Sequence, residues 1–236
     1  MSMIINAHRF AVSPPVGGGA MPTFVGLSTI ANSSSSASIS FQNSGRQAGD
    51  LLMIGIGVAN EPLSSSDIPT GFTNLGFFGA GGISATTSTG VNVVYKISNG
   101  SETTISFPDL GDYIIVGGIV VRGVNQANPI HATQFSRGLF GNQHIIEGVT
   151  TTIPSCFIAG FSSLSDNTNT SNLANPNIDN LTEQFKRIST SSHDGTLFGF
   201  TGEFADPGNI GNTTYTSQLQ EFSTSFICAV APAPSE

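Results

Sequence analysis

The chain has 236 residues, which suits one large all-β domain that can bury a core without a disulfide or a metal ion. Only 9% of the residues are charged, against about 25% in an ordinary soluble domain. This composition excludes long solvent-facing helices, which are rich in Glu, Lys and Arg, and the 17 Phe residues exclude a disordered chain. The remaining class is a β-rich globular protein with an uncharged polar surface.

The charge balance disfavours two kinds of partner. There are 15 acidic and 7 basic residues, for a formal net charge of -8, and Lys186-Arg187 is the only adjacent basic pair. Nucleic-acid binding requires clustered Lys and Arg, and an anionic membrane surface attracts the same residues. We therefore expect neither nucleic acid nor a membrane as a partner.

The N-terminal part of the sequence predicts a short arm. Residues 13–22 are rich in Pro and Gly and predict a linker, which separates an arm at residues 1–12 from a single domain at 23–231 and a tail at 232–236. The arm does not have the pattern of a signal peptide, because its apolar stretch is short and its basic residue follows that stretch. We expect a soluble product made in a cytoplasm.

Strand patterns recur from residue 23 onward. Residues 37–41, 50–58 and 91–97 alternate in polarity or are apolar, and residues 98–102, with Asn99-Gly100, predict a hairpin turn into 105–107. Residues 113–124 predict a central strand with a bulge at Gly117-Gly118, while Gly55 and Gly57 indicate close approach of another backbone. The other predicted strands lie near residues 72–78, 145–151, 155–164, 181–188, 196–204 and 218–230. The pattern favours an antiparallel β-sandwich of jelly-roll type.

Three polar, Asn-rich stretches at residues 125–144, 165–180 and 205–217 are expected to be long loops. Loops on a rigid sandwich often carry recognition, but solvated connections or contacts between subunits are the alternative interpretation. Candidate outward contacts in the second stretch are Asp166, Asn167, Asn169, Asn172, Asn175 and Asn177.

The sequence shows little support for catalysis. Cys156 and Cys228 each lie in an apolar run and are expected to be buried free thiols. A nucleophile elbow, a zinc motif, a Walker A loop and a calcium loop are all missing from the sequence, so we expect no catalytic residue, no cofactor and no metal site. Glycoside hydrolysis needs only two carboxylates, and the acidic residues of the second half that could supply them are Asp166, Asp179, Glu183, Asp194, Glu203 and Asp206. A carbohydrate-binding adhesin would instead use the Asn-rich loops, although a chain without Trp offers few stacking residues.

Several short motifs resemble those of bacteriophage virion proteins. The strings are Ala48-Gly49-Asp50-Leu51-Leu52, Ile68-Pro69-Thr70-Gly71-Phe72-Thr73-Asn74-Leu75, Val94-Tyr95-Lys96-Ile97, Gly100-Ser101-Glu102-Thr103, Arg122-Gly123-Val124 and Asn128-Pro129-Ile130. The opening Ile4-Ile5-Asn6-Ala7-His8-Arg9-Phe10 is similar to the start of phage tail-associated proteins, with His8 where tyrosine is usual. The likeness covers roughly residues 1–12 and 36–130.

The resemblance implies a non-catalytic β-sandwich on the particle exterior. It would be a tail-fibre or receptor-binding module or, alternatively, a capsid-decorating (cement) protein. The arm, with Ile5, Asn6, His8, Arg9 and Phe10, would dock on other virion proteins of the tail or capsid. The resemblance also implies a homo-oligomer, commonly a trimer, at the virion surface, with a host surface receptor as a further partner.

Overall fold

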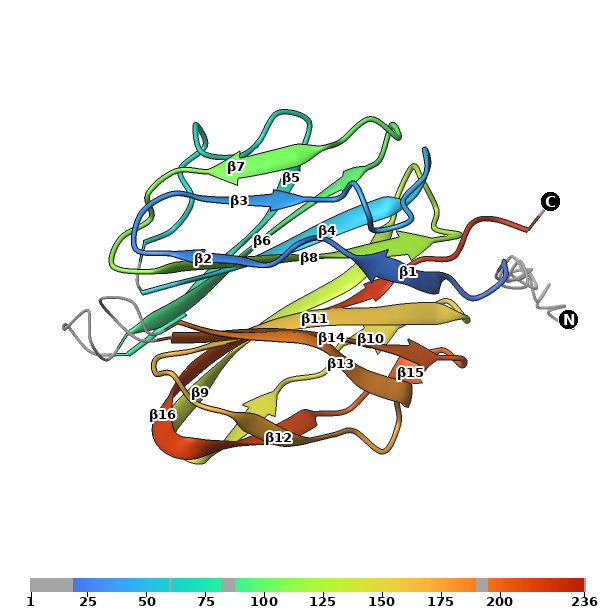
Figure 1. Ribbon diagram of the computed structural model, residues 1–236. Coiled ribbons are helices and arrows are strands. Elements are labelled where there is room, and N and C mark those ends of the chain that lie inside the picture. The colour runs from blue at the N-terminus through green and yellow to red at the C-terminus, as the bar shows by residue number, and fades with distance from the viewer. Residues whose placement is uncertain (1–18, 60, 82–87, 190–194, 236) are drawn as a thin grey trace, which may run out of the picture.

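The structure is a computed structural model that describes residues 19–59, 61–81, 88–189 and 195–235. The predicted all-β, antiparallel sandwich is confirmed (Figure 1). The arm at residues 1–12 and most of the predicted linker lie outside the described residues.

Each half of the chain forms one sheet. The first sheet contains β1 (Thr23–Leu27), β2 (Ala31–Ser33), β4 (Leu51–Val58), β5 (Thr73–Ala80), β6 (Thr89–Ile97) and β8 (Ile114–Arg122). The second contains β9 (Ile130–Ile146), β11 (Cys156–Leu164), β12 (Thr170–Ala174), β13 (Asp179–Ser189), β14 (Gly195–Phe204) and β16 (Thr213–Val230). Two small pairs are β3 (Ala37–Ser40) with β7 (Thr104–Phe107), and β10 (Thr150–Thr151) with β15 (Gly208–Asn209). The chain therefore completes one sheet before it begins the other, unlike a jelly roll, whose strands alternate between sheets.

The two sheets repeat one connectivity. The order β8-β4-β6-β5 in the first sheet corresponds to β16-β11-β14-β13 in the second. β1 and β2 pair with β8 as β9 pairs with β16, and β3–β7 and β10–β15 occupy matching places along the chain. Contacts between the sheets match as well, since β6 packs on β16 as β14 packs on β8. The sandwich is a structural duplication with a pseudo-twofold relation between its halves.

Strand register shows that the correspondence holds residue by residue. In the first sheet, Leu51 of β4 pairs with Ile97 of β6 and with Val121 of β8. In the second sheet, Phe157 of β11 pairs in the same way with Glu203 of β14 and with Val230 of β16. Both sheets also have a bulge at the same place on the edge strand. Leu75 is its unpaired residue in β5 and Gln184 is its unpaired residue in β13. These pairings make Leu51 equivalent to Phe157, and Leu75 equivalent to Gln184.

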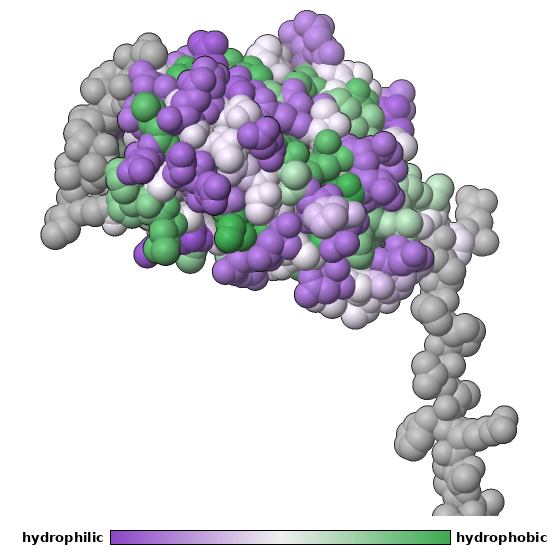
Figure 2. Space-filling model, turned by 90° about the horizontal axis from the view of Figure 1, so that it is seen from below, coloured by the Kyte–Doolittle hydropathy of each residue, from purple (hydrophilic) through white to green (hydrophobic). Residues whose placement is uncertain are grey.

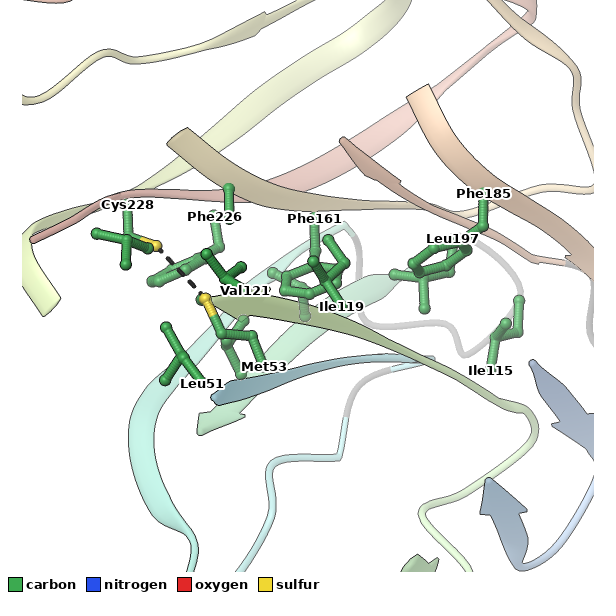
Figure 3. Packing of buried hydrophobic residues seen from close by; sticks show 14 of the residues in the cluster. Leu51, Met53, Ile115, Ile119, Val121, Phe161, Phe185, Leu197, Phe226 and Cys228 are labelled. Carbon is green, nitrogen blue, oxygen red and sulfur yellow. Dashed lines mark hydrogen bonds between the residues drawn. The ribbon is translucent and has the colours of Figure 1, made fainter. Parts of the chain in front are cut away.

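Apolar residues fill three layers. The core between the sheets contains Met53, Phe161, Phe185 and Phe226 (Figure 3). A second core lies on the outer face of the first sheet, beneath β3 and β7. A third lies on the outer face of the second sheet and includes Phe198 and Tyr215. Each sheet is thus buried on both faces, so its central strands are continuously apolar rather than alternating.

The paired strands β9 and β16 fold back on themselves. Gln134 Nε2 donates to Glu147 Oε2 at 2.8 Å, although Glu147 directly follows β9 and is thirteen positions from Gln134. In an extended strand the two residues would lie about 43 Å apart. The register between the strands shifts on both sides of Glu221, where β16 turns back at the lower left of Figure 1. Beyond this point the end of β9, the beginning of β16 and β12 form a layer over the third core.

The expectation that residues 125–144 form a loop is wrong. Most of this stretch belongs to β9, which pairs with β16 from Ile130 to Ile146. β9 is an edge strand with many exposed side chains, so it lacks apolar alternation and is fixed by main-chain hydrogen bonds. The stretches at 165–180 and 205–217 likewise contain β12, β15 and the beginning of β16.

The bulge expected at Gly117-Gly118 is also wrong, because β8 pairs with β4 in continuous register there. A β-carbon on Gly117 would lie 2.4 Å from the Phe185 ring, and one on Gly118 would lie 2.5 Å from the Phe41 ring. The two glycines make room for aromatic rings on opposite faces of the sheet. Gly55 serves the same purpose, since the group that approaches it is the Phe161 ring rather than a backbone.

The turn expected at residues 98–102 is present, with Gly100 at φ 85°, but it does not form a hairpin. β6 already pairs with β4 on one side and β5 on the other, so no edge is free for the next strand. β7 leaves the sheet and pairs with β3 instead.

Candidate functional site

Among the described residues, several of the motifs that resemble phage proteins lie at one end of the first sheet. Asp50 is buried and accepts hydrogen bonds from Arg122 Nε at 2.9 Å and Arg122 Nη2 at 2.8 Å. Its Oδ2 also accepts the Gln47 N–H at 2.7 Å. A bidentate guanidinium–carboxylate pair restrains the orientation of both side chains. This pair joins the beginning of β4 to the end of β8.

A second carboxylate holds the neighbouring turn. Glu102 is buried and binds Lys96 Nζ at 2.9 Å, Ser98 Oγ at 2.7 Å and the Asn99 N–H at 3.0 Å. Burial alone would raise the pKa of Glu102, but these hydrogen bonds outweigh it and lower the pKa from 4.5 to about 2. The Lys96 ammonium also lies 5.9 Å from the centre of the Phe72 ring. These contacts give the motif residues a structural role at this end of the sheet.

A buried His and two serines lie where β9 and β16 fold back. His144 Nδ1 is 2.9 Å from Ser223 Oγ, and its Nε2 is 2.9 Å from Ser217 Oγ. Ser217 donates its hydroxyl proton to the Leu219 carbonyl oxygen at 2.7 Å, so His144 Nε2 donates to Ser217 and Ser223 donates to Nδ1. Burial lowers the pKa of His144 from 6.5 to about 4. Each hydroxyl proton is engaged in an internal hydrogen bond, which suits a structural tie better than an activated nucleophile.

Glu221 is buried at the same fold-back. Its Oε2 accepts the Asp166 N–H at 3.0 Å, and its Oε1 has no hydrogen-bond partner among the described residues. Burial, with a smaller contribution from the nearby Asp166 charge, raises the pKa of Glu221 from 4.5 to about 8. The side chain is therefore largely a neutral carboxylic acid at pH 7.

Large apolar side chains are exposed at the fold-back. Leu139 is 83% exposed, Phe140 58% and Leu219 45%, and the Phe140 ring lies 5.3 Å from that of Phe222 between centres. We call these four residues the fold-back corner. Green surface gathers on the left of the molecule in Figure 2, the side on which Figure 1 shows β16 turning back. A patch of this kind marks a contact with another molecule more often than isolated exposed apolar residues do.

A shallow hollow of about 340 Å³ adjoins the corner. Its lining residues are Arg137, Gly138, Leu139, Gln143, Ile145, Glu147 and Asn212. Ile145 is 50% exposed there, and β9 pairs with β16 along one side only. The corner therefore offers apolar side chains, a depression and a strand edge together, as many protein interfaces do.

The predicted outward contacts are mostly tied into the protein. Asn175 is buried and donates to Thr213 Oγ1 at 3.0 Å, and Asn177 donates to the Ile210 carbonyl at 3.0 Å. Asn172 lies on β12 at φ 56° and donates to Thr216 Oγ1. Asp166, Asn167 and Asn169 lie in the connection before β12, where the Asn169 carbonyl accepts the Gln218 N–H. The predicted docking residues Ile5, Asn6, His8, Arg9 and Phe10 lie outside the described residues.

Cys156 and Cys228 are free and buried, as predicted. Of the carboxylates considered for glycoside hydrolysis, Asp179 and Glu203 are strand partners, Glu183 binds Lys186 at 3.4 Å, and Asp194 lies outside the described residues. Across the described ranges, no group of three or more His, Cys, Asp or Glu residues is placed to hold a metal ion.

None of the described segments is a helix long and apolar enough to span a membrane.

No family model, curated protein or solved structure matches this chain.

Proposed function

We propose that this chain is a non-catalytic structural protein on the exterior of a bacteriophage particle, most simply a tail-associated fibre or receptor-binding module. Its place there would depend on contacts with other virion proteins and with further copies of itself, in a homo-oligomer such as a trimer. Residues 1–12 would dock it on the particle.

The fold-back corner is the observation that carries this proposal. Leu139, Phe140 and Leu219 expose apolar surface on a chain in which only 9% of residues are charged. Burying apolar surface favours association, and a surface poor in charge lets neighbouring molecules pack without desolvating many ions. Both features suit a protein that functions by being held in an assembly.

The proposal predicts that the corner can be changed without loss of the fold. The double variant Leu139→Ser/Phe140→Ser replaces exposed side chains, so the melting temperature should stay near that of the wild type. In analytical ultracentrifugation the wild type should sediment as an oligomer, and the variant should shift toward the monomer. Gln42→Ser, at an exposed position outside the corner and its hollow, is the control and should behave as the wild type.

A second experiment tests the particle. Deletion of residues 1–12, followed by purification of particles, should leave the protein folded but absent from them. Incorporation of both the deletion and the corner variant at wild-type levels, with unchanged sedimentation, would contradict the proposal. Imaging of labelled protein on the head would favour the second candidate, a capsid-decorating protein, which the same corner would also suit.

A further inference from the structure

A polar groove opens between β1 and β13, the edge strands of the two sheets, and it is separate from the fold-back corner. Figure 1 shows β1 on the right and the turn of β16 on the left. The groove has a volume of about 350 Å³. Its lining residues are Thr23, Phe24, Phe157, Asn180, Thr182, Gln184, Thr201, Gly202 and Glu203. One wall is therefore aromatic, and the other carries hydroxyl, amide and carboxylate groups.

The polar wall is held in place by internal hydrogen bonds. Gln184 Nε2 donates to Thr201 Oγ1 at 2.7 Å, and Asn180 Nδ2 donates to Glu203 Oε2 at 3.0 Å. Asn180 has a positive φ of 53°, which few residues other than Gly, Asn and Asp adopt readily. Thr182 is the strand partner of Thr201 and completes the wall. The polar groups are positioned before any ligand arrives.

The duplication provides an internal comparison, because the groove has an equivalent corner on the other side of the sandwich. We call this equivalent place the apolar corner, and its residues are Ile130, Leu75, Tyr95 and Ile97. Their equivalents in the groove are, in the same order, Phe24, Gln184, Thr201 and Glu203. In the apolar corner all four side chains pack against the core between the sheets.

One of two equivalent corners is thus closed with apolar side chains, and the other is open and polar. Phe24 is half-buried and packs against the same core, so the groove begins where the core ends. Polar groups at positions that could complete an apolar core weaken its packing. Their presence at three of the four positions needs a reason other than stability, and a ligand supplies one.

We propose that this groove binds a neutral saccharide. Sugar hydroxyls both donate and accept hydrogen bonds, as does the Gln184 amide. The Thr182 hydroxyl donates to the Asn180 carbonyl oxygen at 3.0 Å and can accept from a sugar, as can the Glu203 carboxylate. The Phe24 ring offers an apolar surface for the C–H face of a pyranose. The lining residues include one carboxylate and no Lys or Arg, which disfavours an anionic ligand. The volume lies within the usual range for small-ligand sites.

Binding can be measured on the purified full-length protein by saturation-transfer NMR. The probes are glucose, galactose, mannose, N-acetylglucosamine, maltose and lactose, with glucuronic acid as the charged comparison. At least one neutral sugar should receive saturation from the protein, and glucuronic acid should receive less. Absence of transfer to every neutral sugar, or stronger transfer to glucuronic acid, would overturn the proposal.

Variants locate the binding. Glu203→Gln and Phe24→Leu should each weaken binding about tenfold, the effect of losing one charge-assisted hydrogen bond or one stacking contact. Glu183→Gln is the matched control. It makes the same change of Glu to Gln on β13, at a residue that does not line the groove. Wild-type affinity in both groove variants would overturn the proposed site.

A closing variant tests the comparison between the two corners. Gln184→Leu/Glu203→Ile places the residues of the apolar corner in the groove and should abolish binding while the melting temperature holds or rises. Retained binding in this folded variant would overturn the proposal, and if it does not fold, the single variants decide. All these measurements use the isolated protein, so their outcome is independent of incorporation into particles.

Discussion

Gly55 in β4 and Phe161 in β11 are equivalent residues of the two sheets, and they contact each other across the core. Gly55 follows Leu51 on β4 as Phe161 follows Phe157 on β11, and Leu51 and Phe157 hold matching register positions. A β-carbon on Gly55 would lie 2.4 Å from the Phe161 ring. The two halves therefore pack because they differ: one supplies the ring and the other the space for it.

Gly55→Ala should destabilise the protein by about 1–3 kcal/mol, since the new methyl group overpacks a rigid interior. Urea unfolding measures the change. The second substitution Phe161→Leu shortens the opposing side chain, so the double variant should be more stable than the sum of the two single effects. Gly141→Ala is the control and should be close to neutral, because a β-carbon there would lie 3.9 Å from the Leu139 carbonyl oxygen, an ordinary contact distance. Simple additivity of the two core substitutions would contradict the contact.

Glu221 should make the protein less stable as the pH rises. Burial raises its pKa to about 8, so the folded state keeps a proton that the unfolded state releases near pH 4.5. The folded state then binds more protons between these values, and the free energy of unfolding falls from pH 4.5 to about 8. Glu221→Gln should remove that slope and be more stable than the wild type at pH 8. Parallel pH profiles for the two proteins would show that Glu221 is not the group responsible.

Glu102 should act in the opposite direction and in a lower pH window. Its pKa of about 2 lies below the value of 4.5 in an unfolded chain, so the unfolded state binds more protons between these limits. Its contribution to stability is present above pH 4.5 and is lost as the pH falls to about 2. Glu102→Gln should be less stable than the wild type at pH 7, with the difference shrinking in acid. A difference independent of pH would argue against the hydrogen bonds described for this carboxylate.

Both thiols should be protected in the folded state. Burial raises the pKa of Cys156 to about 11 and also raises that of Cys228, whose Sγ lies 3.9 Å from Met53 Sδ in the core between the sheets (Figure 3). A thiol reacts as its thiolate, so a thiol-specific reagent should label neither residue without denaturant and both in strong denaturant. Rapid labelling of the native protein would show that one of the two is accessible.

The sequence predicted those elements whose signal is local. The apolar run at Leu51–Val58 predicted a strand, and the two apolar runs that contain Cys156 and Cys228 were correctly assigned to the interior. β9 was missed because an exposed edge strand with residues such as Gln134 and Asn142 carries no such pattern. The turn at Gly100 was found, but the partner of β7 was not, because that depends on which strand edges remain free.

The candidate sites were also missed where they depend on packing between distant parts of the chain. The sequence singled out Asn-rich segments, whereas the exposed Leu139 and Phe140 lie in a stretch that it assigned to a loop. Their exposure follows from the fold-back of β9 on β16, which brings Gln134 beside Glu147. An apolar pair in a polar stretch was the available signal, but it does not distinguish a buried contact from an exposed one.

Composition and strand pattern by themselves determined the all-β class, the antiparallel sheets and the buried cysteines, because each depends on the polarity of neighbouring residues along the chain. Only the tertiary structure decided that the two halves repeat one topology. Several equivalent positions carry unlike residues, such as Gly55 with Phe161 and Ile97 with Glu203, so the strand pattern did not reveal the duplication. Gly55 and Phe161 are complementary in shape because opposite faces of one core must fit each other, and that fit exists only after the sheets have packed.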